Sequence, residues 1–87
     1  MDKYITPDVL EVKVLDNYLL KIVFATKEEK IFDMKNLIEN NKVYFRLKNK
    51  EYFNKVKPRG ETVEWENGED VSPESLYYDS KSIQNNF

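Results

Sequence analysis

The stretch EWENGEDVSPESLYY, residues 64–78, carries the strongest local structural signals in this chain. Asn67-Gly68 favours a tight turn, because both residues tolerate left-handed backbone conformations. Ser72 followed by Pro73 predicts a helix start, since a serine hydroxyl accepts a free backbone N–H and proline suits the first helical position. The stretch therefore predicts a strand end, a turn and a short capped helix.

Trp65 is the single tryptophan and stands between Glu64 and Glu66. On a strand, alternate side chains point to opposite faces, so we expect Trp65 to point into the core while the two glutamates face water. An alternative is a partly exposed tryptophan at a partner interface, where this residue is favoured. The residues expected to fix the structure are Asp33, Trp65, Asn67, Gly68, Ser72, Pro73, Leu76 and Tyr77.

The first half of the chain is predicted to be an antiparallel meander. Apolar residues alternate with other residues over 10–14, at Leu10, Val12 and Val14, and again over 20–24, which is typical of half-buried strands. Residues 15–18 predict the turn between these strands. Residues 30–32 predict a third, short strand, after a turn that runs over 26–29.

The middle of the chain is predicted to be helical. Asp33 is expected to cap a short helix, and residues 43–56 favour two further turns, the second capped by Asn49. A strand over 61–66 follows. The predicted fold is α+β: a small antiparallel meander, short helices in the middle, and a C-terminal β-hairpin followed by a capped helical turn. Its predicted domain organisation is one domain over residues 1–79 and a polar tail over residues 80–87.

Composition excludes several classes of function. The chain of 87 residues has no cysteine and no histidine, so it lacks thiolate chemistry and the usual base near neutral pH. An EF-hand register that places Gly68 at position six puts Val63 and Trp65 where oxygen ligands are needed. We therefore expect no metal, no cofactor and no enzymatic activity, and we interpret the clustered carboxylates as a solvated face.

Membrane insertion is not expected, because no segment approaches eighteen consecutive apolar residues. The N-terminal stretch MDKYITPDVL also lacks the apolar region of a secretory signal. These features favour a cytoplasmic protein with no membrane partner.

Two stretches carry a family resemblance. One is FATKEEKIFD, residues 24–33, in which Thr26-Lys27 stands where a glycine-containing turn is typical. The other, more specific stretch contains Val63, Trp65, Asn67-Gly68, Asp70, Pro73-Glu74 and Leu76-Tyr77. In this order, the two stretches resemble the small bacterial family filed as domain of unknown function 2442, and the resemblance runs from Pro7 to about Tyr77.

The resemblance implies no established activity. Members are free-standing small proteins or precede a helix-turn-helix domain, and their setting suggests a toxin–antitoxin-like or regulatory role. Because this chain ends soon after the resemblance, we expect the appended DNA-binding role not to carry over.

Charge is strongly segregated along the chain. Residues 42–59 hold seven basic residues and one acid, a net of +6, whereas the other 69 residues have a net charge of −8. If the two kinds of segment stay apart in space, they favour electrostatic docking with another small protein or with a second copy of the chain. The candidate partner-binding residues are Glu64, Glu66, Glu69, Asp70, Arg46, Lys48, Lys50 and Lys55.

Nucleic acid is the alternative partner. The basic segment 42–59 also contains Tyr44, Phe45, Tyr52 and Phe53, and cations with aromatic rings can bind single strands by phosphate contact and stacking. We expect these rings to be buried instead. A sequence pI of about 5.2 also lacks the basicity of typical nucleic-acid binders. The protein-interaction hypothesis is therefore preferred.

Overall fold

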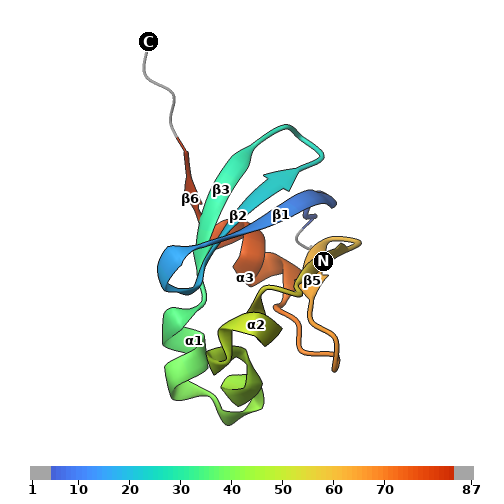
Figure 1. The fold of residues 1–87 in the computed structure, drawn as a ribbon. Helices are drawn as coiled ribbons and strands as arrows, with labels where there is room; N and C mark the ends of the chain where they lie inside the picture. The colour runs from blue at the N-terminus through green and yellow to red at the C-terminus, as the bar shows by residue number, and fades with distance from the viewer. Residues whose placement is uncertain (1–4, 84–87) are drawn as a thin grey trace.

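The computed structural model describes residues 5–83 and confirms the α+β fold (Figure 1). The main sheet has the strand order β1-β2-β3-β6, and all its neighbouring pairs are antiparallel. A separate hairpin is formed by β4 and β5. The strands are β1 (Val9–Leu15), β2 (Leu19–Phe24), β3 (Glu29–Asp33), β4 (Lys57–Arg59), β5 (Thr62–Glu64) and β6 (Lys81–Ser82). The α-helices are α1 (Lys35–Asn40), α2 (Lys50–Phe53) and α3 (Pro73–Tyr78), and the 3₁₀ helices are η1 (Asp16–Tyr18) and η2 (Lys42–Lys48).

The inner face of the meander follows the predicted alternation, with one exception. Every second residue of β2 is buried, and Val12 of β1 lies opposite Ile22 on the same face. The prediction that Leu10 shares this face is wrong, because its side chain is 52% exposed. The register shifts between Val9 and Glu11. Such a bulge places an extra residue in one strand, so Val9 is buried in place of Leu10.

Both hairpin turns of the meander use left-handed residues. Asn17 has φ 60° and Tyr18 has φ 62° in the first turn, and Lys27 has φ 81° in the second. A tyrosine in this region is strained. Hydrogen bonds hold it there, since the Tyr18 hydroxyl donates to the Lys48 carbonyl at 2.6 Å and the Tyr18 carbonyl accepts from Met34 N–H at 3.0 Å.

The predicted caps start the short helices. The Asp33 carboxylate accepts the Lys35 N–H at 2.8 Å, although α1 begins one residue later than a simple cap at Asp33 implies. The Asn49 side chain accepts the Tyr52 N–H at the start of α2, and Ser72 Oγ accepts the Ser75 N–H at the start of α3. These side chains satisfy backbone donors that have no partner within the helix.

The second hairpin is shorter than the predicted strand over 61–66. Gly60, at φ 57°, turns β4 into β5. The ladder ends at Glu64, because Asn67-Gly68 turns the chain back and Trp65 N–H bonds to the Glu69 carbonyl. Trp65 therefore lies beyond the end of β5, and its side chain is still buried in the core.

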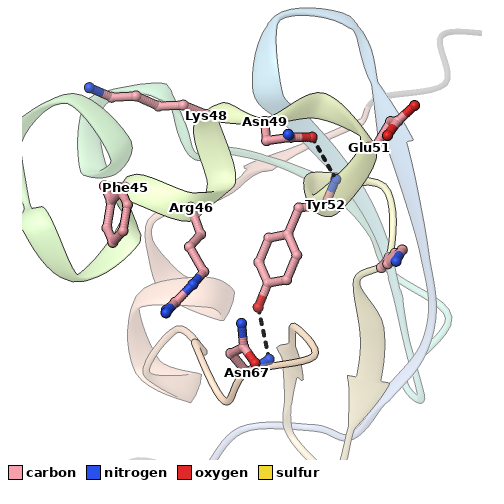
Figure 2. Close-up of a pocket in the computed structure, with 8 residues that line it drawn as sticks. Phe45, Arg46, Lys48, Asn49, Glu51, Tyr52 and Asn67 are labelled. Carbon is pink, nitrogen blue, oxygen red and sulfur yellow. Dashed lines mark hydrogen bonds between the residues drawn. The ribbon is translucent and has the colours of Figure 1, made fainter.

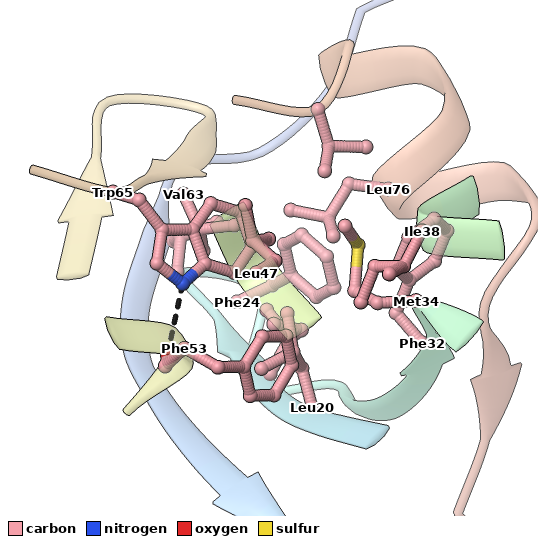
Figure 3. Packing of buried hydrophobic residues seen from close by; sticks show 13 residues of the cluster. Leu20, Phe24, Phe32, Met34, Ile38, Leu47, Phe53, Val63, Trp65 and Leu76 are labelled. Atoms are coloured by element: carbon pink, nitrogen blue, oxygen red, sulfur yellow. Dashed lines mark hydrogen bonds between the residues drawn. The ribbon is translucent and has the colours of Figure 1, made fainter. Parts of the chain in front are cut away.

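Trp65 forms one side of the core between the sheet and the helices (Figure 3). Its Nε1–H donates to the Phe53 carbonyl at 2.8 Å, and its ring stacks on Phe53 with centroids 5.6 Å apart. The prediction that Trp65 is a core residue is confirmed. The core also contains Val9, Leu20, Ile22, Phe24, Phe32, Met34, Ile38, Leu47, Phe53, Val63, Val71 and Leu76.

The start of the expected polar tail belongs to the sheet. Lys81 and Ser82 form β6, which pairs with β3, and Ile83 N–H donates to the Glu29 carbonyl. The rest of that expected tail, residues 84–87, lies outside the described residues. The short turn after α3 brings the chain back to β3, so the last described residues extend the meander to four strands.

Tyr77 of α3 fastens the helix to the meander. Its hydroxyl donates to Glu28 Oε1 at 2.6 Å, and its carbonyl accepts from the buried Lys30 Nζ at 2.7 Å. The Lys30 amine also lies 3.8 Å from the centre of the Tyr77 ring. The hydrogen bond from Tyr77, followed by that from Thr26, lowers the pKa of Glu28.

Replacing Trp65 tests how much this residue contributes to the stability of the core. We expect Trp65→Ala to lower the free energy of unfolding by about 3–5 kcal/mol, because it leaves a large cavity. Trp65→Phe keeps a ring, loses the bond to the Phe53 carbonyl and should cost less. Chemical denaturation of both variants measures the two effects, and an unchanged stability in Trp65→Ala would contradict the core assignment.

Tyr77→Phe tests the bond to Glu28. We expect the pKa of Glu28 to rise toward its ordinary value, which an NMR titration of its carboxyl group measures. A lowered folded-state pKa gives stability above the unfolded-state pKa that is lost as pH falls through the folded-state pKa. The deficit of the variant should therefore be present at neutral pH and shrink in acid, whereas a pH-independent deficit would contradict the linkage.

Candidate functional site

The acidic turn, residues 64–70, lies against the basic segment, residues 42–59, so the two do not form separate patches. Three ion pairs join them, at 3.6 Å for Arg46–Glu69, 3.7 Å for Lys55–Glu66 and 2.7 Å for Arg59–Glu64. The charge segregation seen along the sequence is therefore partly cancelled within one molecule. The exposed pairs add little stability, since water screens them.

Glu69 is buried, and the expectation that it belongs to an exposed acidic face is wrong. Its side chain is only 5% exposed. The turn at Asn67-Gly68 directs it inward, where Oε1 accepts a hydrogen bond from the Tyr52 hydroxyl at 2.5 Å. Within residues 5–83, Glu69 Oε2 has no hydrogen-bond partner. Burying a carboxylate oxygen that accepts no hydrogen bond is costly, so the stability of this cluster depends on the groups around Glu69, Arg46 among them.

Tyr52 connects the acidic turn to α2 (Figure 2). Its hydroxyl donates to Glu69 and accepts the Asn67 N–H at 2.8 Å. Burial, followed by the hydrogen bond to Glu69, raises the pKa of Tyr52, so the hydroxyl keeps the proton that it donates. Tyr44 makes a parallel link, because its hydroxyl donates to the Asp70 carbonyl at 2.8 Å.

An open groove of about 630 Å³ lies beside this cluster, between η2, α2 and the acidic turn (Figure 2). Three cations and one acid line it, so its walls are basic. Tyr52 and two asparagine side chains contribute polar groups. The lining residues are Phe45, Arg46, Lys48, Asn49, Glu51, Tyr52, Lys55 and Asn67.

Phe45, which lines the groove, is 59% exposed, and Val43 of the same 3₁₀ helix is 60% exposed. The expectation that the aromatic rings of the basic segment are buried is wrong for Phe45. The reason is that η2 is a 3₁₀ helix, whose side chains three residues apart share a face. Tyr44 and Leu47 therefore point inward, and their neighbours point out.

The structure brings together some of the predicted partner-binding residues. Arg46, Lys48 and Lys55 line the groove, whereas Lys50 lines a different hollow beside the first turn of the meander. Glu64, Glu66 and Glu69 each face a cation of this chain. Asp70 acts through its backbone, by a bridge to Glu64 and through the carbonyl that Tyr44 contacts. Whether any of these residues binds a partner stays a prediction.

Sequence reasoning missed most of the groove. Phe45 was expected inside, and the contributions of Asn49, Glu51, Tyr52 and Asn67 to a common surface were not foreseen. A three-residue spacing of the inward side chains, at 44 and 47, is the signal that would have indicated the outward position of Phe45.

Over residues 5–83, no three His, Cys, Asp or Glu side chains gather closely enough to hold a metal ion. In the same part of the chain, no helix reaches the length and apolar character needed to cross a bilayer.

A comparison with protein families covers the chain from the first residue of β1 to the last residue of β6. The model of the family described as "Protein of unknown function (DUF2442)" matches residues 9–82. The chain belongs to the DUF2442 family. No curated protein and no solved structure matches it significantly. Membership names no reaction.

Tyr52→Phe tests the buried cluster of this DUF2442 domain. The variant removes the donor to Glu69 and the acceptor of the Asn67 N–H, so we expect a loss of about 1–3 kcal/mol of unfolding free energy. Tyr44→Phe is the matched control, since its hydroxyl bonds only to a neutral carbonyl, and it should cost less. Equal losses in denaturant titrations would show that the carboxylate is not the sensitive partner.

Proposed function

We propose that this protein is a non-enzymatic protein-interaction module, and that the basic groove with its exposed apolar rim binds an acidic segment of another protein. An apolar side chain of that segment packs on Val43 and Phe45. Its carboxylates meet the cations of the groove. A regulatory or antitoxin-like role is the setting in which such a module would act.

The observation that carries this proposal is the exposure of Val43 and Phe45 beside Arg46 and Lys48. Single exposed apolar residues such as Leu10 are common and need no explanation. Two on one short 3₁₀ helix, next to cations that line a hollowed surface, combine apolar and charged groups as protein interfaces do.

Charge supports an acidic partner. Within the described residues, the lysines of the basic segment that form no ion pair are Lys42, Lys48, Lys50 and Lys57. All four are exposed. In the neighbouring turn, Glu64, Glu66 and Glu69 already face Arg59, Lys55 and Arg46. Glu51 and Asp70 remain to offset the four lysines, so the surplus over residues 42–59 and 64–70 is positive. Such a surplus steers an acidic partner and sets its orientation.

Single-stranded nucleic acid is the second candidate. The exposed ring of Phe45 beside Arg46 and Lys48 favours it, because bases stack on such rings while cations contact phosphates. Tyr44 and Tyr52 are held by hydrogen bonds of their hydroxyls, and Phe53 is buried. One free ring is a small stacking platform, so the protein partner is preferred.

The test is affinity capture from host lysate with nuclease present, comparing the wild type with the double variant Val43→Ser and Phe45→Ser. Both side chains are exposed, so the fold should persist, which a thermal melt checks. Leu10→Ser is the matched control for loss of an exposed apolar residue elsewhere. We expect the wild type to retain a protein that contains an acidic segment. The captured amount should fall at least about tenfold in the double variant and stay unchanged in the control.

A charge variant completes the test. Lys48→Glu with Lys55→Glu should also release the partner, whereas Lys13→Glu with Lys21→Glu, on the far face of the sheet, should retain it. Binding that disappears with nuclease, or that survives the double variant, would overturn the proposal. Steep weakening of nucleic-acid binding with salt would then support the second candidate.

A further inference from the structure

We infer that Arg46 is shared between Glu69 and the partner, and that the groove takes a carboxylate of an acidic peptide segment at Arg46 in competition with Glu69. This inference rests on the proposed function and deepens it. It names the group that is recognised, the residue that recognises it, and an internal competitor that limits the affinity.

Arg46 has hydrogen-bonding capacity to spare. Its Nη1 lies 3.6 Å from Glu69 Oε2, which is an ion pair beyond hydrogen-bond distance. A guanidinium has five N–H donors in a planar fork that suits carboxylates. The side chain is 51% exposed and lines the groove, and its Cζ lies 5.5 Å from the Phe45 ring centre. It is therefore open to a second carboxylate arriving over the apolar rim.

Glu69 is fixed, so an exchange of partners requires movement of Arg46. The Tyr52 hydroxyl holds Oε1, and the Glu69 carbonyl accepts the Trp65 N–H at 2.9 Å, next to the Glu64–Asp70 bridge. Arg46 is on the exposed side of a 3₁₀ helix, and Figure 2 shows its side chain extending along the groove toward the acidic turn. A long exposed side chain reorients more readily than a buried carboxylate held by a tyrosine.

The position of Glu69 indicates the chemistry of the ligand. A carboxylate already faces Arg46, and the other groove cations, Lys48 and Lys55, can contact further acids of the same segment. When Arg46 turns to the partner, Glu69 loses its counter-charge while it stays buried, and this penalty opposes binding. Removing the charge of Glu69 should therefore strengthen the binding of an acidic peptide.

The experiment titrates the full chain with the peptide tetraglutamate and follows the Arg46 guanidinium signal by NMR. In Glu69→Gln the amide oxygen can still accept from Tyr52, so the fold should persist. We expect affinity to rise by at least about fivefold, the lower end of typical coupling between sites. Glu29→Gln is the matched control, because it removes the same charge from an exposed residue whose partner, Lys21, does not line the groove.

Tighter binding in Glu69→Gln alone, abolished by adding Arg46→Gln, supports the inference. Equal gains in Glu69→Gln and Glu29→Gln would reduce the effect to net charge and overturn it. In the wild type, peptide shifts that leave the Arg46 signal unmoved would overturn it too, whatever the stability of the variants. If Glu69→Gln binds no better while the lysate partner is still captured, the inference fails and the proposed function stands. The proposed function fails separately, if capture by the wild type disappears with nuclease or survives the Val43→Ser and Phe45→Ser double variant.

Discussion

The position of Trp65 determines how the turn over residues 64–70 meets α2. Its ring lies on Phe53, and its N–H bonds to the Phe53 carbonyl at the end of α2. A buried indole that lacks this acceptor would leave its donor unpaired, at a cost comparable to that of a lost hydrogen bond. The acidic turn that follows Trp65 is thereby held against α2. The ion pairs, the Tyr52–Glu69 bond and the groove all depend on that placement.

This placement changes the meaning of the charge pattern. Along the sequence, an acidic and a basic segment look like two docking surfaces of opposite sign. In the fold they meet, and Glu64, Glu66 and Glu69 face Arg59, Lys55 and Arg46. Self-association through opposite patches loses support, because these three acids already face cations of the same chain. What remains is a positive surplus beside exposed apolar side chains, which favours an acidic partner.

The predictable parts of the fold are those that local chemistry decides. Ser72 and Asn49 cap helices because their side chains accept nearby N–H groups, and strand alternation placed Ile22 and Trp65 inside. Leu10 was misplaced because a bulge shifts the register, which the alternation of β1 does not reveal. Glu69 was misplaced because its burial depends on Tyr52, seventeen residues earlier in the chain. The candidate groove depends on contacts such as Tyr52–Glu69 between distant parts of the chain, so only its cations were foreseen.

The 3₁₀ form of η2 links the fold to the proposed site. An α-helix over these residues would rotate successive side chains by about 100°, whereas a 3₁₀ helix rotates them by about 120° and gives a strict three-residue period. Tyr44 and Leu47 then fill the inward face, and Val43 and Phe45 have no inward position. The 3₁₀ form of η2 thus leaves the apolar side chains of Val43 and Phe45 outside, and a partner that covers them would remove the cost of their exposure to water.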